Sequence, residues 1–459
     1  MIDFTKGNIT KQIAVFSLPL LFANVLQQAH SMVDAIIVGR FIGGSALAAV
    51  GISGFIFVFM LAIMFGLATG ASVLISQFYG ARQEENLRRT VSTSFILLSG
   101  LALAVSLLGA VFTPSLLRIL DVPADAYADA VVYLRILIVG NTILGLVYNL
   151  FAAYLRALGD TRGPLYILLV SVVLNLFLTT WFVVTLDLGV AGAAWATILS
   201  QAFASVLTYL YAVKYAPVLK LSGFVFDREI AKSVLRYSIP AAIQFSLTSL
   251  NTLIIMRLVN SFGLSAAAGF TAAARIDQFA ILPMSSISVA ISTFVAQNMG
   301  AGLEDRAKAG FRSSFLFMVT IGLFSSVFIR FFAGWIVSMF VDPTAAHAYD
   351  IMLIGTEYLM VIANFYILFA IFFAFNGFFR GVGDAVIVMI LTVTSLTIRM
   401  VSSHVLAHFT DLGPVSVAWA IPIGWTLCSM YCFWHYKTRR WDGKMQMKVA
   451  RDEVQAAEN

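Results

Sequence analysis

The chain is 459 residues long, and 60% of its residues are hydrophobic while only 11% are charged. This composition excludes a soluble globular domain and a disordered chain, and it indicates a protein whose solvent is lipid. The formal net charge of +6 does not indicate a nucleic-acid partner, because the Lys and Arg residues stand in short tracts between apolar segments. That pattern is typical of membrane topology.

Twelve apolar segments are long enough to cross a hydrocarbon core of about 30 Å, which needs about twenty helical residues. Backbone groups in lipid must be satisfied internally, so each segment is predicted to be a helix. The first continues past Pro19 without a small-residue cleavage site and is predicted to remain in the membrane. The segments are Ala14 to Val38, Leu47 to Phe78, Val91 to Leu116, Val131 to Leu155, Leu165 to Leu186, Val190 to Val213, Tyr237 to Leu258, Phe270 to Val295, Phe315 to Val341, Ile351 to Phe379, Ile387 to Ala407 and Val415 to Tyr436.

The orientation of the chain follows from its basic residues, which are retained on the cytoplasmic side of a membrane. Most of the 29 Lys and Arg residues precede the first segment or lie in the even-numbered loops, in the stretch 214–236 and in the tail. The opposite loops, such as those that begin at Asp121 and Asp342, are short and acidic or neutral. We therefore expect a multi-pass protein of the bacterial inner membrane with both termini in the cytoplasm.

Four motifs recur in the same order and at a nearly constant spacing in the second half of the chain, which indicates a duplicated six-helix unit. Because six is an even number, the copies share an orientation and are predicted to be related by a pseudo-twofold axis along the membrane normal. The prediction is an all-α polytopic fold with an N-lobe (1–213), a cytoplasmic linker (214–236), a C-lobe (237–436) and a cytoplasmic tail (437–459). The motifs are Phe16-Ser-Leu-Pro19 and Tyr237-Ser-Ile-Pro240, Gln77-Phe-Tyr-Gly80 and Gln297-Asn-Met-Gly300, Arg156-Ala-Leu-Gly-Asp160 and Arg380-Gly-Val-Gly-Asp384, and the segments that start at Asp187 and Asp411.

Several function classes lack their motifs in this sequence. There is no Gly-x-x-x-x-Gly-Lys-Ser/Thr phosphate loop, no His-Glu-x-x-His and no Gly-x-Ser-x-Gly, so we expect neither an enzyme nor a cofactor. His404 and His408 have the spacing of a helical metal pair, but only Asp411 offers a third ligand. We interpret them as interfacial histidines and predict no metal site. Cys428 and Cys432 are interpreted as packing residues.

The segment from Phe16 to Gly39, the Gln77/Gly80 segment, the two Arg-x-x-Gly-Asp loops and the Leu-Gly-x-x-Gly-Ala-Ala-Trp-Ala segment resemble the MATE family (multidrug and toxic compound extrusion). The likeness covers the chain apart from its tail. It implies a two-lobed antiporter that exports small organic cations or amphiphilic drugs in exchange for protons, or for sodium, by alternating access. We expect it to act as a monomer in contact with membrane lipid.

The resemblance also implies a cation site in the N-lobe. The second N-lobe aspartate of some members is replaced here, and the tenth segment has no acidic residue in its core, so a sodium site in the C-lobe is not expected. A site that rests on one aspartate favours protons. The matching positions are Gln27 and Asp34 on the first helix, Asn149 on the fourth, Asn175 on the fifth and Thr197 on the sixth. Thr179 stands where some members have the second aspartate, and Gln244 stands on the seventh helix, where sodium-type members have a glutamate.

Asp34 and Arg399 are unusual for their depth in apolar segments. A carboxylate at the middle of a membrane helix costs about 2.5 to 3.5 kcal/mol on insertion scales. Asp34 is either a hydrated carboxylate of the outer leaflet or the group at which proton and cationic substrate compete. Arg399 stands at the repeat position of Asn175, too far inside for snorkelling, and needs a partner. The candidates are Glu357 and Asp277, in a structural ion pair or in a site.

The Arg-x-x-Gly-Asp loops and the basic residues inside the apolar segments bear on the gate and on the substrate. The loops that end at Asp160 and Asp384 are predicted to cap helices and stabilise a gate. The alternative function is a flippase for a lipid-linked saccharide or a similar amphiphile, which a wide basic cavity would favour. The basic residues inside the apolar segments are few, which favours the exporter.

Overall fold

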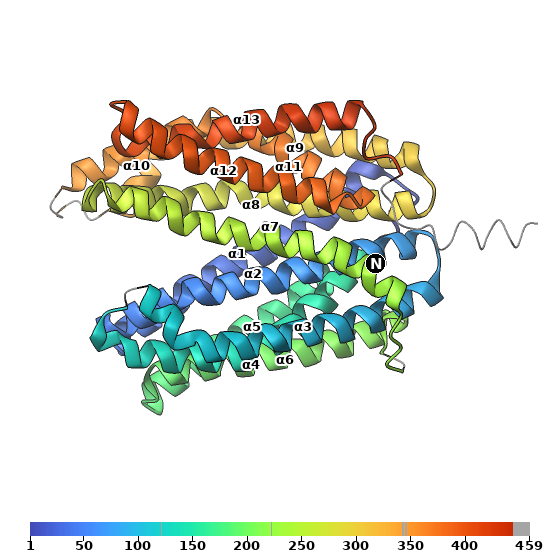
Figure 1. The fold of residues 1–459 in the computed structure, drawn as a ribbon, viewed down its shortest axis with the longest axis horizontal. Helices are drawn as coiled ribbons and strands as arrows, with labels where there is room; N and C mark the ends of the chain where they lie inside the picture. The colour runs from blue at the N-terminus through green and yellow to red at the C-terminus, as the bar shows by residue number, and fades with distance from the viewer. Residues whose placement is uncertain (121, 222, 342–343, 345–346, 444–459) are drawn as a thin grey trace, which may run out of the picture. The chain divides into compact units, whose positions relative to one another are not determined.

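The computed structural model describes residues 1–120, 122–221, 223–341, 344 and 347–443. Asp121, Asp342 and the tail beyond residue 443 therefore lie outside the described residues. Every regular element in the described part is helical (Figure 1). The elements are α1 Ile9–Phe41, α2 Gly44–Gly80, α3 Glu84–Ile119, α4 Ala124–Ala157, α5 Arg162–Thr180, η1 Trp181–Thr185, α6 Gly189–Tyr215, η2 Pro217–Leu219, α7 Arg228–Asn260, α8 Leu264–Gly300, α9 Glu304–Ser338, α10 Ala348–Ala363, α11 Tyr366–Val382, α12 Ala385–Phe409, η3 Gly413–Val415 and α13 Ser416–Lys437.

The predicted all-α fold with twelve membrane segments is confirmed. Within the described ranges, eleven helices are long and apolar enough to span a membrane, and the count is twelve if α10 and α11 form one span. The tenth predicted segment differs, because α10 and α11 meet at a bend of 56°. At the bend the side chain of Asn364 donates to the carbonyl of Met360 at 2.9 Å, and the amide of Phe365 donates to Ile362 at 2.8 Å. The second bond spans three residues and not four, so the backbone leaves the α-helical pattern at this point.

The chain divides into two compact units. Unit 1 comprises Met1–Asp3 and Leu18–Ser246, and unit 2 comprises Phe4–Ser17 and the chain from Leu247 onward. Helices α1 and α7 are therefore each shared between the units. The two units are defined by which segments contact one another. The lobes 1–213 and 237–436 were inferred from the sequence repeat, and they stay a prediction.

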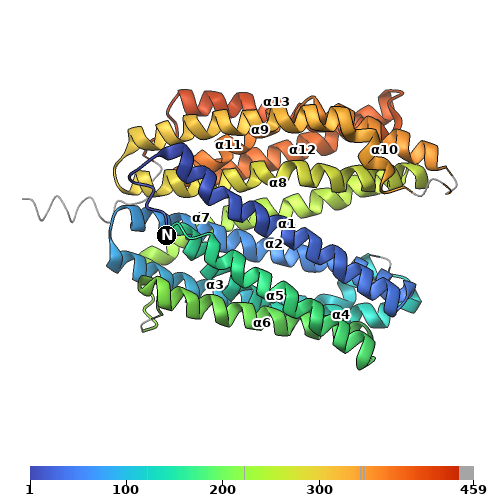
Figure 2. The same cartoon turned by 180° about the vertical axis from the view of Figure 1, so that it is seen from behind.

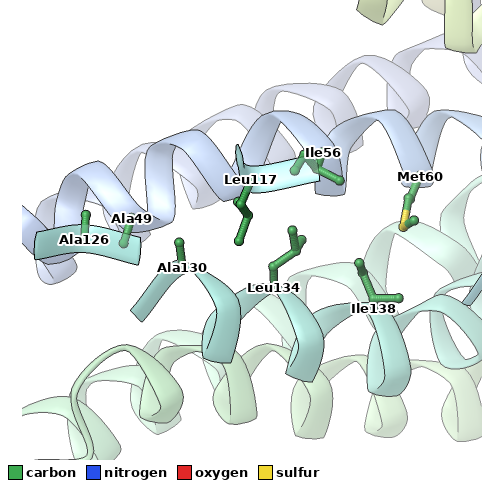
Figure 3. Packing of buried hydrophobic residues seen from close by; sticks show 8 residues of the cluster. All are labelled: Ala49, Ile56, Met60, Leu117, Ala126, Ala130, Leu134 and Ile138. Carbon is green, nitrogen blue, oxygen red and sulfur yellow. The ribbon is translucent and has the colours of Figure 1, made fainter. Parts of the chain in front are cut away.

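Unit 1 is held together by a small apolar core and by close helix contacts. Helices α2 to α6 lie side by side in it (Figures 1 and 2). Figure 3 shows the core where α2, α3 and α4 meet, with Met60 and Ile138 facing each other. A Cβ on Gly70 of α2 would lie 2.3 Å from the Cα of Ser238, so only glycine permits this contact. Ser238 also donates to the carbonyl of Leu67 at 2.9 Å, which fastens α7 to α2.

Unit 2 uses the same kind of contact between α8 and α11. A Cβ on Gly377 would lie 2.5 Å from the carbonyl oxygen of Ser288, and one on Gly381 would lie 2.7 Å from that of Ser292. The Gly-x-x-x-Gly spacing thus brings two backbones into contact in each unit, as membrane helices commonly do. This packing holds α8 and α11 together in unit 2.

The two Arg-x-x-Gly-Asp loops have related but different roles. Asp160 accepts from the backbone amides of Arg162 and Gly163, both at 3.0 Å, so the predicted helix cap is confirmed there. Its other oxygen accepts from Tyr211 at 2.9 Å. Asp384 makes no such side-chain cap and lies 3.2 Å from Nε2 of His435, which stands at the repeat position of Tyr211. The cap predicted for Asp384 is therefore wrong.

Candidate functional site

A group of polar side chains joins α1, α5 and α6 inside unit 1. Asp34 and His30 lie one turn apart on α1, on the same face, with Nε2 of His30 3.5 Å from Oδ2 of Asp34. The side chain of Asp34 is 29% exposed and that of His30 is 17% exposed, so both are partly withdrawn from the surface. Tyr133 of α4 lies within range of electrostatic interaction with the Asp34 carboxyl. A titratable pair therefore stands within a helix of membrane-spanning length.

Asn175 of α5 is the centre of this group and is buried. Its Oδ1 lies 2.8 Å from Nε2 of His30, and its Nδ2 donates to Oγ of Ser200 on α6 at 3.1 Å. Thr179 contributes a longer bond of 3.4 Å to the same Oδ1. Because an amide oxygen only accepts, Nε2 of His30 must carry the proton in this arrangement. The imidazole thus links the Asp34 carboxyl to the buried amide.

Helix α5 departs from regular α-helical geometry at its end, next to this polar group. The helix α5 continues into the π-helical turn η1, and π-turns within helices are frequent at functional sites. Val183 of η1 packs with Val38, Val190 and Ala193 in a buried apolar cluster. This cluster joins α1, η1 and α6 beside the polar group. The polar cluster therefore has a packed apolar boundary.

The other predicted residues of unit 1 differ from this group in their bonds or their exposure. Thr197 donates to the carbonyl of Ala193 in its own helix, and Asn149 donates to that of Gly145. Gln27 is exposed and Gln244 is half-buried. The contacts of His30 and Asn175 therefore bring together Asp34, Asn175 and Thr179, and the roles predicted for Gln27, Asn149, Thr197 and Gln244 stay predictions.

His30 and Ser200 belong to the group but were not predicted. The sequence held one signal for His30, its four-residue spacing from Asp34, which places both side chains on one helix face. Ser200 gave no such signal, because a serine in a membrane helix often bonds its own backbone. Ser200 does so here, to Ala196 at 2.8 Å, while it also accepts from Asn175.

A second polar group lies in unit 2 around Arg399 of α12. Asp277 of α8 is the candidate partner that interacts electrostatically with Arg399, and Oδ1 of Asp277 accepts from Oη of Tyr366 at 2.8 Å. Glu357, the other candidate, is exposed. Among the described residues, no carboxylate lies within 4.0 Å of the Arg399 nitrogens. A structural ion pair, one of the two alternatives for Arg399, is therefore not formed as a direct contact in the described part of the chain.

Comparison with known proteins identifies the family. A family model described as MatE matches residues 19–181 and 240–405. The chain belongs to the MatE family. The two matched stretches begin at Pro19 and Pro240, which are the paired prolines of the first sequence repeat.

Relatives of this MatE protein are named as multidrug resistance proteins or as a transporter. "Probable multidrug resistance protein YpnP" of Bacillus subtilis is 30% identical over 96% of this chain and 97% of its own. An "FAD transporter" of Shewanella oneidensis is 25% identical over 91% of this chain and 92% of its own. A solved structure described as MATE in the bent conformation is 25% identical, covers 95% of this chain and 96% of its own, and superposes with a TM-score of 0.88. The resemblance inferred from the sequence motifs is confirmed.

Proposed function

We propose that this MatE protein is a secondary active exporter that exchanges small organic cations or amphiphilic drugs for protons across the bacterial inner membrane. The names of the relatives support export of drug-like compounds. The observation that carries the exchange is the linked group of Asp34, His30 and Asn175, within helices of membrane-spanning length. A carboxylate that binds either a proton or a cationic substrate makes the two exclude each other, and that exclusion couples their movements.

The chemistry of this group supports protons over sodium as the coupling ion. Hard cations prefer a shell of several oxygen ligands. In the group around Asp34 the Oδ1 of Asn175 already accepts from His30 and Thr179, and Nε2 of His30 lies 3.5 Å from the Asp34 carboxyl. A carboxyl beside a donor imidazole suits the uptake and release of a proton, which needs no oxygen cage.

The proposal includes a transport cycle and a topology. Unit 1 and unit 2 are each built on close glycine contacts, which support movement of each as a packed body during alternating access. Both termini are proposed to lie in the cytoplasm and the chain to act as a monomer. The exported compound need not be a simple cation, because one relative is named for FAD, a phosphate-bearing dinucleotide.

The test uses purified protein in proteoliposomes with a pH-sensitive dye inside. Addition of a cationic dye substrate on the side that binds it should release protons, and efflux driven by a pH gradient should proceed without sodium. The control is the variant Asp125→Asn, which neutralises an exposed carboxylate in the first turn of α4. Efflux that requires a sodium gradient and shows no proton release would refute proton coupling.

A further inference from the structure

Unit 2 repeats the polar positions of the candidate site in unit 1. In the register that pairs Pro19 with Pro240, His30 corresponds to Asn251. In the register that pairs Asp160 with Asp384, the positions of Asn175 and Thr179 are taken by Arg399 and Ser403. The two groups therefore occupy equivalent positions of the repeat, but the negative charge of Asp34 in unit 1 contrasts with the positive charge of Arg399 in unit 2.

The group in unit 2 is held in place by contacts with neighbouring helices. The side chain of Asn251 donates to the carbonyl of Leu396 at 3.1 Å, which ties α7 to α12 one turn before Arg399. A Cβ on Gly424 of α13 would lie 2.8 Å from the carbonyl oxygen of Ser395, so α13 packs closely against the same turn of α12. Arg399 and Ser403 lie one turn apart on one face of this helix.

The two groups differ in how their polar atoms are satisfied. In unit 1, His30 and Thr179 both bond to Asn175. In unit 2, three buried atoms at the corresponding positions have no hydrogen-bond partner among the described residues, namely Nε of Arg399, Oγ of Ser403 and Oδ1 of Asn251. Ser403 is 0% exposed and Asn251 is 6% exposed. Buried polar atoms without partners also occur elsewhere in the described residues, but here three of them lie on neighbouring turns of α7 and α12, which points to a bound group.

The charge at this position indicates the kind of group that is missing. Asp277 interacts electrostatically with Arg399, but one of its oxygens is engaged by Tyr366 at 2.8 Å. Asp277 thus orients the guanidinium without covering its N–H groups by direct contact. A planar guanidinium presents several donors that match the oxygens of a carboxylate or a phosphate. Oγ of Ser403 is a further donor on the same face of α12.

We infer that Arg399 and Ser403 bind an anionic group, a carboxylate or a phosphate, of the exported amphiphile. The substrates of this protein then include zwitterionic and acidic amphiphiles in addition to simple organic cations. Oδ1 of Asn251 accepts an N–H or a water that accompanies the anionic group. The inference rests on the proposed export function, because it names a substrate class for the same transport cycle.

The experiment compares two fluorescent probes that differ only in the anionic group, a rhodamine with a free carboxylate and its methyl ester. Their affinities for the purified full-length protein in phosphate-free maltoside micelles are measured by fluorescence polarisation. Arg399→Gln should weaken binding of the acid by about 10- to 150-fold and change binding of the ester less than about twofold. Ser403→Ala, a smaller change, should weaken the acid alone by several-fold. The matched control is Arg330→Gln, which removes an exposed guanidinium of α9 in the same unit.

The outcomes separate the inference from the proposed function. Wild-type protein that binds neither probe would contradict the export proposal itself. Equal losses for acid and ester in Arg399→Gln and in Ser403→Ala, with both variants folded, would overturn the anion site while export stands. Displacement of the acid by dihexanoylphosphatidylglycerol in wild type but not in Arg399→Gln would support the site and identify a lipid phosphate as an occupant.

Discussion

The buried amide of Asn175 offers a prediction with a magnitude that the structure sets. Asn175→Ala removes the bonds to His30 at 2.8 Å and to Ser200 at 3.1 Å, and the longer contact with Thr179 at 3.4 Å adds little. Each of the two good bonds contributes about 0.5 to 1.5 kcal/mol, so their joint loss is about 1 to 3 kcal/mol. The charge of Asp34 stays. We therefore expect slower efflux, by about 5- to 150-fold, with proton coupling retained.

The assay for this prediction is gradient-driven dye efflux from proteoliposomes at equal protein content. The matched control is Asn149→Ala, because Asn149 bonds the carbonyl of Gly145 in its own helix at 2.7 Å, and its loss should change the rate less than about threefold. The proton-to-substrate ratio is measured in the same vesicles. A folded Asn175→Ala protein with wild-type efflux, or with none at all and no proton release, would refute the reasoning.

Three further predictions concern the imidazole, the helix packing and the topology. His30→Leu removes the N–H donated to Asn175 and the imidazole beside Asp34, and it should slow efflux several-fold, with partial recovery in His30→Gln, as measured in the same vesicles. Gly70→Ala places a Cβ 2.3 Å from the Cα of Ser238 and should lower the melting temperature by several degrees, whereas Gly54→Ala meets no atom within 4 Å and should leave it unchanged. Equal melting temperatures for the two variants would contradict the packing. A reporter in the stretch 214–236 should read cytoplasmic and one in the stretch 342–347 periplasmic, and the reverse would contradict the topology.

Much of the fold could be predicted from the sequence, because lipid imposes simple constraints on a chain. Hydropathy alone located the twelve spans, since every apolar segment of sufficient length must be helical in a membrane. The bend between α10 and α11 could not be predicted in this way, because Asn364 and Phe365 stand within a continuous apolar run. The bend coincides with the three-residue bond from Phe365 to Ile362, and hydropathy carries no information about the local hydrogen-bond pattern.

The candidate site was predictable only in part. Asp34 was conspicuous because a charge within an apolar helix is costly. His30 and Asn175 stand far apart in the sequence, so no local pattern reveals the bond between them. Thr197 was expected beside Asp34 by family likeness, and this stays a prediction. Ser200, one turn further on, bonds Asn175 and was not expected.

The central claim is that Asp34 couples ion and substrate, and its most direct test is the variant Asp34→Asn. Asparagine is nearly isosteric with the protonated acid and neutral, so the variant should insert and fold normally. Dye affinity of the purified protein and gradient-driven efflux from proteoliposomes are measured side by side. The account predicts dye binding within a few-fold of wild type together with loss of gradient-driven efflux. Normal gradient-driven efflux by Asp34→Asn would contradict it.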